Sequence, residues 1–259
     1  MADNRLRPGA PGSPSAGCRR VVWHRAWGLC SALVGLVLVV LAGAGLATVP
    51  DLMDEERAFE AAVPCGSSAV AGADCLRPVG ATVMRTVIQD VPKHEEFTLR
   101  LGGPPDVPHE IDMGASGPLL TRLQQGDRVT VTMWRDYATA VSRDGVTQES
   151  ADTPVGEPVF VTALMLALLP CGAYALYAGG VALRRARRHA ERGLPAFLLT
   201  RGKQACGAAL CALPALLVGD VAGPWVAVAG WLAMLPLVLL AVRRLERSRG
   251  RHAAPPPTR

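Results

Sequence analysis

The chain has 259 residues, of which 50% are hydrophobic and 19% are charged, and its formal net charge is +5 at pH 7. A basic chain of this size is a candidate nucleic-acid binder, but its charges are separated by position. Residues 50–157 hold 18 acidic and 9 basic residues, whereas the rest of the chain holds 18 Lys or Arg residues. Membrane orientation accounts for this separation, so we expect no nucleic-acid partner.

Four apolar segments are candidates for crossing a bilayer, whose hydrocarbon core requires about 20 helical residues. None of them contains an Asp, Glu, Lys, Arg or His residue, which argues against an ion-coupled pump. We predict four transmembrane helices, at residues 26–49, 158–183, 204–219 and 221–242.

The first segment has one competing interpretation, a cleaved signal peptide. A basic stretch precedes it, and Ala42-Gly43-Ala44 resembles a cleavage site. Its apolar run is longer than that of a typical signal peptide, which favours an uncleaved anchor.

The third segment, residues 204–219, is short for a span. We expect Arg201 and Lys203 to snorkel and so lengthen it by a turn. A single helix that also included the fourth segment would be roughly 58 Å long, which exceeds the bilayer core. Asp220 and the pair Gly223-Pro224 instead predict a tight turn between two helices.

The Lys and Arg residues outside 50–157 predict the orientation, because short cytosolic loops are enriched in them. All of them fall in residues 1–25, 184–203 and 243–259, which share one side if the four segments cross in turn. Arg outnumbers Lys by 25 to 2, which is the usage of a GC-rich bacterial genome. We therefore predict a bacterial plasma-membrane protein with both termini in the cytosol. The segments 1–25 and 243–259 are predicted to be disordered basic tails, and 184–203 a basic cytosolic loop.

The lipid bilayer is the first expected partner. The basic run 184–188 either contacts anionic lipid headgroups or is a solvated flank of the second span, and the solvated flank is favoured. A protein partner or a homo-oligomer in the membrane is also a candidate, since small residues at four-residue spacing suit close helix packing. The pairs are Gly43/Ala47, Ala208/Ala212 and Ala229/Ala233.

Cys65 and Cys75 are the two cysteines within residues 50–157. Thiols outside a bacterial membrane are oxidised, so an isolated pair predicts a structural disulfide. It should stabilise the domain by roughly 2–3 kcal/mol in the chain-entropy picture. A redox-active pair is the less favoured alternative, because the spacing is not Cys-x-x-Cys.

The acidic segment between the first two spans predicts a small all-β domain. Residues 51–62 indicate a short helix, with acidic residues in its first turns. Leu119, Leu120 and Leu123 indicate a second short helix at 117–124. Alternating apolar residues predict strands at 81–89, 96–101, 108–113, 128–134, 137–142 and 146–148. Three strands, a helix and two or three further strands are typical of an OB-like barrel.

Candidate catalytic and metal sites are weak. The clusters His94-Glu95-Glu96 and His109-Glu110-Ile111-Asp112 contain metal-ligand types, but neither matches a known zinc motif. Asp90 and Asp136 are acid–base types without a paired partner. The chain lacks a nucleophile elbow, a phosphate loop and a dinucleotide fingerprint. We therefore predict no catalytic residue, metal or cofactor.

A resemblance to known proteins rests on four stretches between the first two spans: Cys65, Asp74-Cys75-Leu76, residues 126–131 and residues 145–148. On these stretches, the plan resembles that of uncharacterised four-span integral membrane proteins of GC-rich Gram-positive, actinobacterial type with a small extracellular β-domain. The resemblance covers roughly residues 50–183, and it also extends distantly to two-span bacterial proteins that hold a β-domain between helices. It implies no mechanism.

We predict a non-enzymatic membrane protein whose extracytoplasmic domain binds or senses a ligand, or acts as an accessory to another protein. One alternative is a small-solute transporter or channel component, because Pro170, Pro214 and Pro236 would kink three spans. A second alternative is a metal-dependent or redox enzyme of the cell-envelope space.

Overall fold

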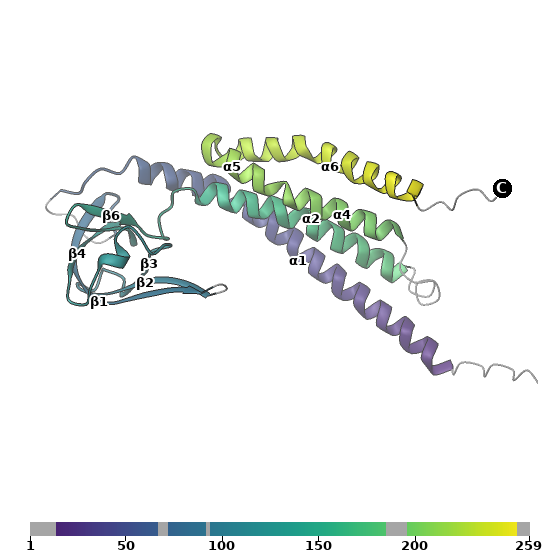
Figure 1. The fold of residues 1–259 in the computed structure, drawn as a ribbon, viewed down its shortest axis with the longest axis horizontal. Coiled ribbons are helices and arrows are strands. Elements are labelled where there is room, and N and C mark those ends of the chain that lie inside the picture. Colours follow the sequence, from purple (N-terminus) through teal and green to yellow (C-terminus); the bar gives the residue numbers. More distant parts are fainter. Residues whose placement is uncertain (1–13, 67–71, 92–93, 185–195, 253–259) are drawn as a thin grey trace, which may run out of the picture. The chain divides into compact units, whose positions relative to one another are not determined.

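The computed structural model describes residues 14–66, 72–91, 94–184 and 196–252 (Figure 1). The chain divides into two compact units. One combines the residues up to Val49 with those from Pro158 onward, and is called the membrane unit. The other, Pro50–Glu157, is called the β-unit. The division falls where the composition changes from apolar to acidic.

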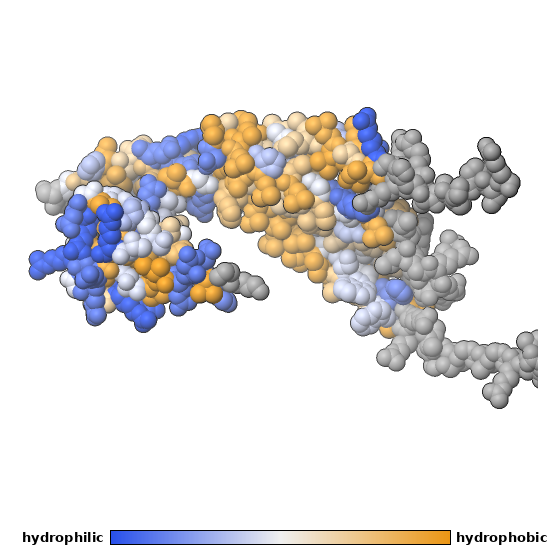
Figure 2. Space-filling view, in the orientation of Figure 1, coloured by the Kyte–Doolittle hydropathy of each residue, from blue (hydrophilic) through white to orange (hydrophobic). Residues whose placement is uncertain are grey.

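Long apolar helices build the membrane unit. By length and composition, four helical stretches are able to cross a membrane: Val21–Glu60, Glu157–Arg184, Phe197–Ala222 and Pro224–Leu245. Figure 2 shows apolar side chains gathered over these helices, and many of them are exposed, with Val221 at 90% and Leu217 at 72%. An exposed apolar surface of this kind is compatible with a lipid environment. The prediction of four apolar helices is confirmed.

The third span is longer than predicted and is built from two helices. It consists of α4 (Ala196–Leu210) and α5 (Ala212–Ala222). The interruption at Cys211 follows from Pro214, whose ring excludes a helical hydrogen bond to the carbonyl of Leu210. Residues 196–203 are helical rather than part of a loop, and the rest of the predicted loop, 185–195, lies outside the described residues.

The predicted tight turn joins α5 to α6 (Pro224–His252). Gly223 has a φ of 89°, and its N–H donates to the carbonyl of Gly219. Pro224 then starts α6, a position at which the missing N–H costs nothing. The indole Nε1–H of Trp231 in α6 donates to the carbonyl of Ala208 in α4 at 2.8 Å. The third span, made of α4 and α5, therefore forms an antiparallel hairpin with α6.

The first helix differs from its prediction at both ends. α1 (Pro14–Glu60) is one helix, in which Pro50 replaces the predicted break between a span and a short helix. One interior proline removes a single backbone hydrogen bond, and a helix tolerates it when its other backbone groups keep their hydrogen bonds. Residues 14–25 are helical, as are 243–252 in α6, so the disorder predicted there is wrong; 1–13 and 253–259 lie outside the described residues.

A seam of glycines joins α1 to α2 (Glu157–Arg184). The seam consists of Gly28 and Gly35 in α1 and Gly172 and Gly179 in α2, spaced by seven residues on each helix. A Cβ at Gly35 would lie 2.4 Å from the backbone nitrogen of Leu176. Backbone approach this close requires glycine. The Ser31 hydroxyl also donates across it, to the carbonyl of Ala175 at 3.0 Å.

The small-residue pairs predicted from four-residue spacing have mixed outcomes. Ala208 and Ala212 are buried, at 6% and 4% exposure. Gly43 has open space at its Cβ position, and Ala229 and Ala233 are exposed. Close packing in the first span thus lies at the glycine seam, which the four-residue rule did not detect because its period is seven.

The β-unit contains six antiparallel strands in the order β3-β2-β1-β4-β5-β6. All six strand predictions are confirmed, and the first strand is longer than predicted. The strands are β1 (Leu76–Val91), β2 (His94–Gly102), β3 (Glu110–Asp112), β4 (Arg128–Trp134), β5 (Tyr137–Arg143) and β6 (Val146–Glu149).

Alternation along the strands places one apolar core on one face of the sheet. Val79, Ala81 and Val83 of β1 face Val129, Val131 and Met133 of β4 in this core. A bulge between Val83 and Arg85 shifts the register beyond it. Between residues 79–83 of β1 and 129–131 of β4, the even-numbered residues, such as Thr82 and Thr130, point to the opposite face.

The sheet is not closed, so an OB-like barrel is not confirmed. The gap between its edge strands is bridged by a side chain, that of Gln148 in β6, which is only 5% exposed. Its Oε1 accepts from the N–H groups of Leu119 and Leu120 at 2.8 and 3.0 Å, and its Nε2 donates to the carbonyls of Met113 and Ala115 at 3.4 and 2.9 Å.

The helix predicted at 117–124 is a single 3-10 turn, η1 (Leu120–Arg122). Its three leucines are buried as the pattern indicated. Gln148 takes two of the N–H groups at the start of the segment, which therefore satisfies its backbone without a longer helix.

Candidate functional site

A shallow cleft of about 600 Å³ lies on the β-unit where β1, β4 and β5 run side by side. Three hydroxyl side chains lie in it, from Thr82, Thr130 and Ser142. Glycine backbone from Gly80, Gly102 and Gly103 forms part of its floor, and a Cβ at Gly80 would meet no atom within 4 Å. The cleft thus offers hydrogen-bonding groups with little steric hindrance.

Two arginines supply the positive charge of the cleft. Arg143 is already neutralised, because it pairs with Asp127 and, at 3.2 Å, with Asp144. Arg128 is exposed, and no side chain in the described part of the chain pairs with it. One guanidinium, with its fork of donors, is therefore available to an oxyanion.

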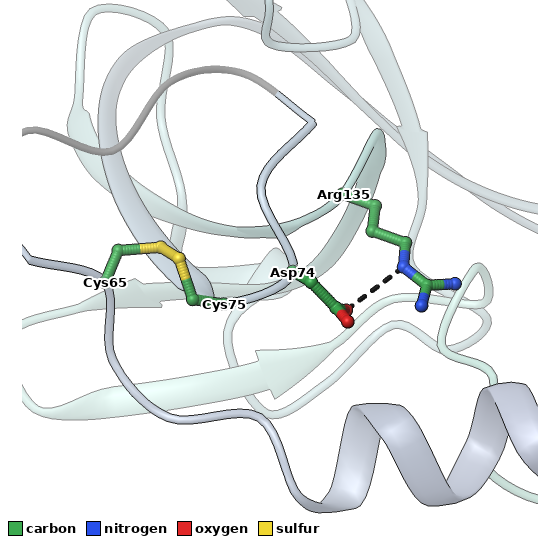
Figure 3. Close-up of a disulfide and its surroundings, with 4 residues drawn as sticks. All are labelled: Cys65, Asp74, Cys75 and Arg135. Carbon is green, nitrogen blue, oxygen red and sulfur yellow. Dashed lines mark hydrogen bonds and ion pairs between the residues drawn. A yellow bond between two sulfur atoms is a disulfide. The ribbon is translucent and has the colours of Figure 1, made fainter.

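A second polar cluster lies around the predicted disulfide, which is present between Cys65 and Cys75 with an S–S distance of 1.98 Å. Figure 3 shows Arg135 directed toward Asp74, which neighbours Cys75; the Nε–Oδ1 distance is 3.1 Å. Arg135 also pairs with Glu55 of α1 at 3.7 Å. These ion pairs join the end of α1, the disulfide loop and the β4–β5 turn.

Aromatic packing reinforces this junction. The rings of Phe59 in α1 and Trp134 in β4 meet edge to face at 5.3 Å, and the Arg135 guanidinium lies 4.3 Å above the Trp134 ring. Glu56 accepts the N–H of Gly156 at 2.6 Å, which ties the end of α1 to the residues before α2. The cluster fixes the two chain connections of the β-unit to each other, so we interpret it as structural.

A further ion pair ties a loop to the sheet. Arg77 in β1 bonds Asp106 at 2.5 Å. This hydrogen bond lowers the pKa of the Asp106 carboxyl, which therefore remains ionised at neutral pH. The pair holds the loop that follows β2 against β1.

The two clusters of metal-ligand types are not brought together. The carbonyl of His109 accepts from the N–H of Leu101 near the end of β2, whereas His94 begins β2. At about 3.3 Å per residue, roughly 23 Å of strand separates them. Among the described residues, no group of three His, Cys, Asp or Glu side chains is placed to hold a metal ion.

The two acid–base candidates also lie apart. Asp90 faces Glu95 across the β1–β2 hairpin, and Asp136 is exposed in the β4–β5 turn. Arg128, the one unpaired guanidinium of the cleft, was not among the residues predicted from the sequence. No sequence signal marks it, because its neighbours come from three strands that pair across the sheet.

Comparisons with protein-family models, with curated proteins and with solved structures gave no match. The function of this chain is therefore inferred from its own geometry, and the actinobacterial resemblance stays a prediction.

Proposed function

We propose that the protein is a multi-pass plasma-membrane protein, with both termini in the cytosol, whose β-unit binds a small polar ligand outside the cell without catalysis. The observation that carries the proposal is the cleft on β1, β4 and β5, which presents Arg128 beside three hydroxyl groups. The ligand would carry one oxyanion, such as a carboxylate or a phosphate, on a hydrogen-bonding body. The transporter and enzyme alternatives remain predictions.

Charge limits the ligand class further. The β-unit has twice as many acidic as basic residues, so a polyanion is repelled by its overall field. A single oxyanion avoids most of this repulsion and still gains a charge-assisted hydrogen bond from Arg128. The neighbouring Asp144 would suit an amine or hydroxyl donor on the same ligand.

The binding proposal predicts a clear effect of Arg128→Gln. Full-length protein in nanodiscs is titrated calorimetrically with N-acetylglucosamine 1-phosphate, with trialanine and with neutral N-acetylglucosamine. We expect the two oxyanion ligands to bind more tightly than the neutral sugar. Loss of a charged hydrogen bond worth about 1–2 kcal/mol should weaken them roughly 5- to 30-fold in the variant.

Two further variants make this test specific. Gly80→Leu fills the cleft without a clash, because the space above Gly80 is open, and should abolish binding. Arg122→Gln removes an exposed arginine of η1 that does not line the cleft, and should leave binding unchanged. Equal weakening by Arg122→Gln and Arg128→Gln, or equal binding of the neutral sugar, would show that the cleft is not the site.

The orientation has its own test. Single cysteines introduced at Gly145 and Ala190 are labelled with a membrane-impermeant maleimide in intact cells, against the unmodified chain as the background. Position 145 should react from outside, and position 190 only after permeabilisation, because basic loops remain cytosolic. Reaction of both positions in intact cells would contradict the proposed threading.

A further inference from the structure

A second pocket, of about 460 Å³, lies within the membrane unit, where α2, α4 and α6 meet. Its volume falls in the range of small-molecule sites, about 300–1,000 Å³. The lining residues come from all three helices: Pro170, Ala173, Tyr174, Tyr177, Arg201, Gln204, Ala205, Ala208 and Leu239. This lining is polar at one side and apolar at the other.

The polar side centres on Arg201. Its guanidinium contacts the amide oxygen of Gln204 at 3.4 Å, and Gln204 is a buried polar residue with 6% exposure. The Tyr174 hydroxyl donates to the carbonyl of Leu198 at 3.1 Å, which leaves its oxygen free to accept a further hydrogen bond. A cation, an amide and a phenol therefore converge on one pocket.

No carboxylate compensates Arg201 within the described side chains of the membrane unit. Asp220 is the one acidic side chain among residues 21–49, 158–184 and 196–245. It lies at the opposite end of the third span, roughly 28 Å away along the helix axis. An anion in the pocket would supply the counter-charge that this guanidinium lacks.

The apolar side is formed by small residues. Ala173 and Ala205 leave space between the helices, and Pro170 and Leu239 provide an aliphatic wall. Gly202 leaves room for the Tyr174 side chain, because a Cβ there would lie 3.1 Å from the Tyr174 hydroxyl. Such a wall offers no hydrogen bonds and suits an acyl chain.

The pocket lies toward the end of the bundle where the basic residues gather. α2 ends at Arg184 and α4 begins at Ala196, and the rings of Tyr177 and Phe197 meet at 6.5 Å. Arg243 and Arg244 follow Leu239 along α6 toward the same end. Aromatic and basic side chains of this kind mark the headgroup level of a membrane.

We propose that this pocket binds an anionic phospholipid, with the phosphate at Arg201 and the upper part of an acyl chain along Ala205 and Leu239. Basic pockets between transmembrane helices recognise lipid headgroups through this combination of one cation, neutral hydrogen-bonding groups and an apolar wall. The site is independent of the cleft on the β-unit, and either can exist without the other.

Native mass spectrometry of the full-length protein tests the site. The protein is titrated in detergent with phosphatidylglycerol and, separately, with phosphatidylcholine of the same chain length. We expect one phosphatidylglycerol to be retained preferentially. Arg201→Gln should raise its dissociation constant by about five-fold or more, since one basic residue near the headgroups contributes on the order of 1 kcal/mol.

Matched variants separate a specific site from a general basic surface. Arg184→Gln removes an exposed base at the same end of the bundle but outside the pocket, and should leave the preference intact. Ala205→Leu fills the apolar side and should reduce retention, whereas Cys206→Leu, at an exposed position of α4 outside the pocket, should not.

Three results would overturn the proposal. They are equal retention of the two lipids, an equal loss in Arg184→Gln and Arg201→Gln, and full displacement of the lipid by millimolar inorganic phosphate. The last result would identify a site for free phosphate rather than for a lipid. Thermal unfolding of Arg201→Gln in detergent serves as a folding check, and Ala205→Leu provides a second variant if Arg201→Gln does not fold.

Discussion

Replacement of Gln148 by leucine should destabilise the β-unit strongly. The side chain satisfies two backbone N–H groups and two carbonyls across the open side of the sheet. A leucine fills similar space but leaves the N–H groups of Leu119 and Leu120 and the carbonyl of Ala115 without a partner; the Met113 carbonyl keeps the N–H of Ala115. Each unsatisfied buried group costs about 1–3 kcal/mol, so for three groups we expect a loss of at least ~3 kcal/mol.

This loss is large relative to the total stability of a domain, which is about 5–15 kcal/mol. Hydrogen–deuterium exchange measured by mass spectrometry should show the amides of Leu119 and Leu120 losing their protection first, because they donate to the missing side chain. Gln125→Leu is the matched control, since Gln125 is exposed near the end of the same segment. Similar exchange in both variants would mean that Gln148 does not hold the segment 119–120 against β6.

The second large effect is expected at the glycine seam. Alanine at Gly35 or Gly179 should separate α1 from α2, because its Cβ would lie 2.4 Å from the backbone nitrogen of Leu176 or 2.6 Å from that of Ala32. Backbone atoms cannot move aside as a flexible side chain does. Overpacking of this kind costs about 1–3 kcal/mol per site, measurable as a shift in SDS-induced unfolding of the protein in micelles.

The same two helices contain their own controls. Gly43 in α1 and Gly180 in α2 have open space at the Cβ position. Alanine at either should cause no loss, and a small gain of about 0.5–1 kcal/mol is expected from its higher helix propensity. If all four variants unfold at the same SDS fraction, the close approach of α1 and α2 does not stabilise the membrane unit.

Much of the local structure could be predicted from local patterns. Alternation of apolar residues located the six strands, and uncharged runs located the four apolar helices, because both signals are periodic along the chain. Boundaries were less predictable: the third span begins earlier, and α1 continues through Pro50. Helix ends depend on packing and on how the backbone is satisfied, which a window of sequence does not contain.

The disulfide could be predicted from the sequence, whereas the cleft could not. Cys65 and Cys75 were predictable as a pair, because they are near in sequence and no other cysteine lies within residues 50–157. Arg128 was not predicted, because it stays unpaired only where Arg143 forms the ion pairs with Asp127 and Asp144. Pairing of this kind is decided by strand register, not by spacing.

The sequence by itself determined how many apolar helices there are, which segment forms a separate sheet, and which two cysteines bond. Each of these follows from composition or periodicity within a short stretch. The tertiary structure alone decided that Gln148 bridges an open sheet, that glycines spaced by seven residues join α1 to α2, and that Arg201 lines a pocket. These depend on contacts between residues far apart in the chain, and such contacts exist only after the elements have packed.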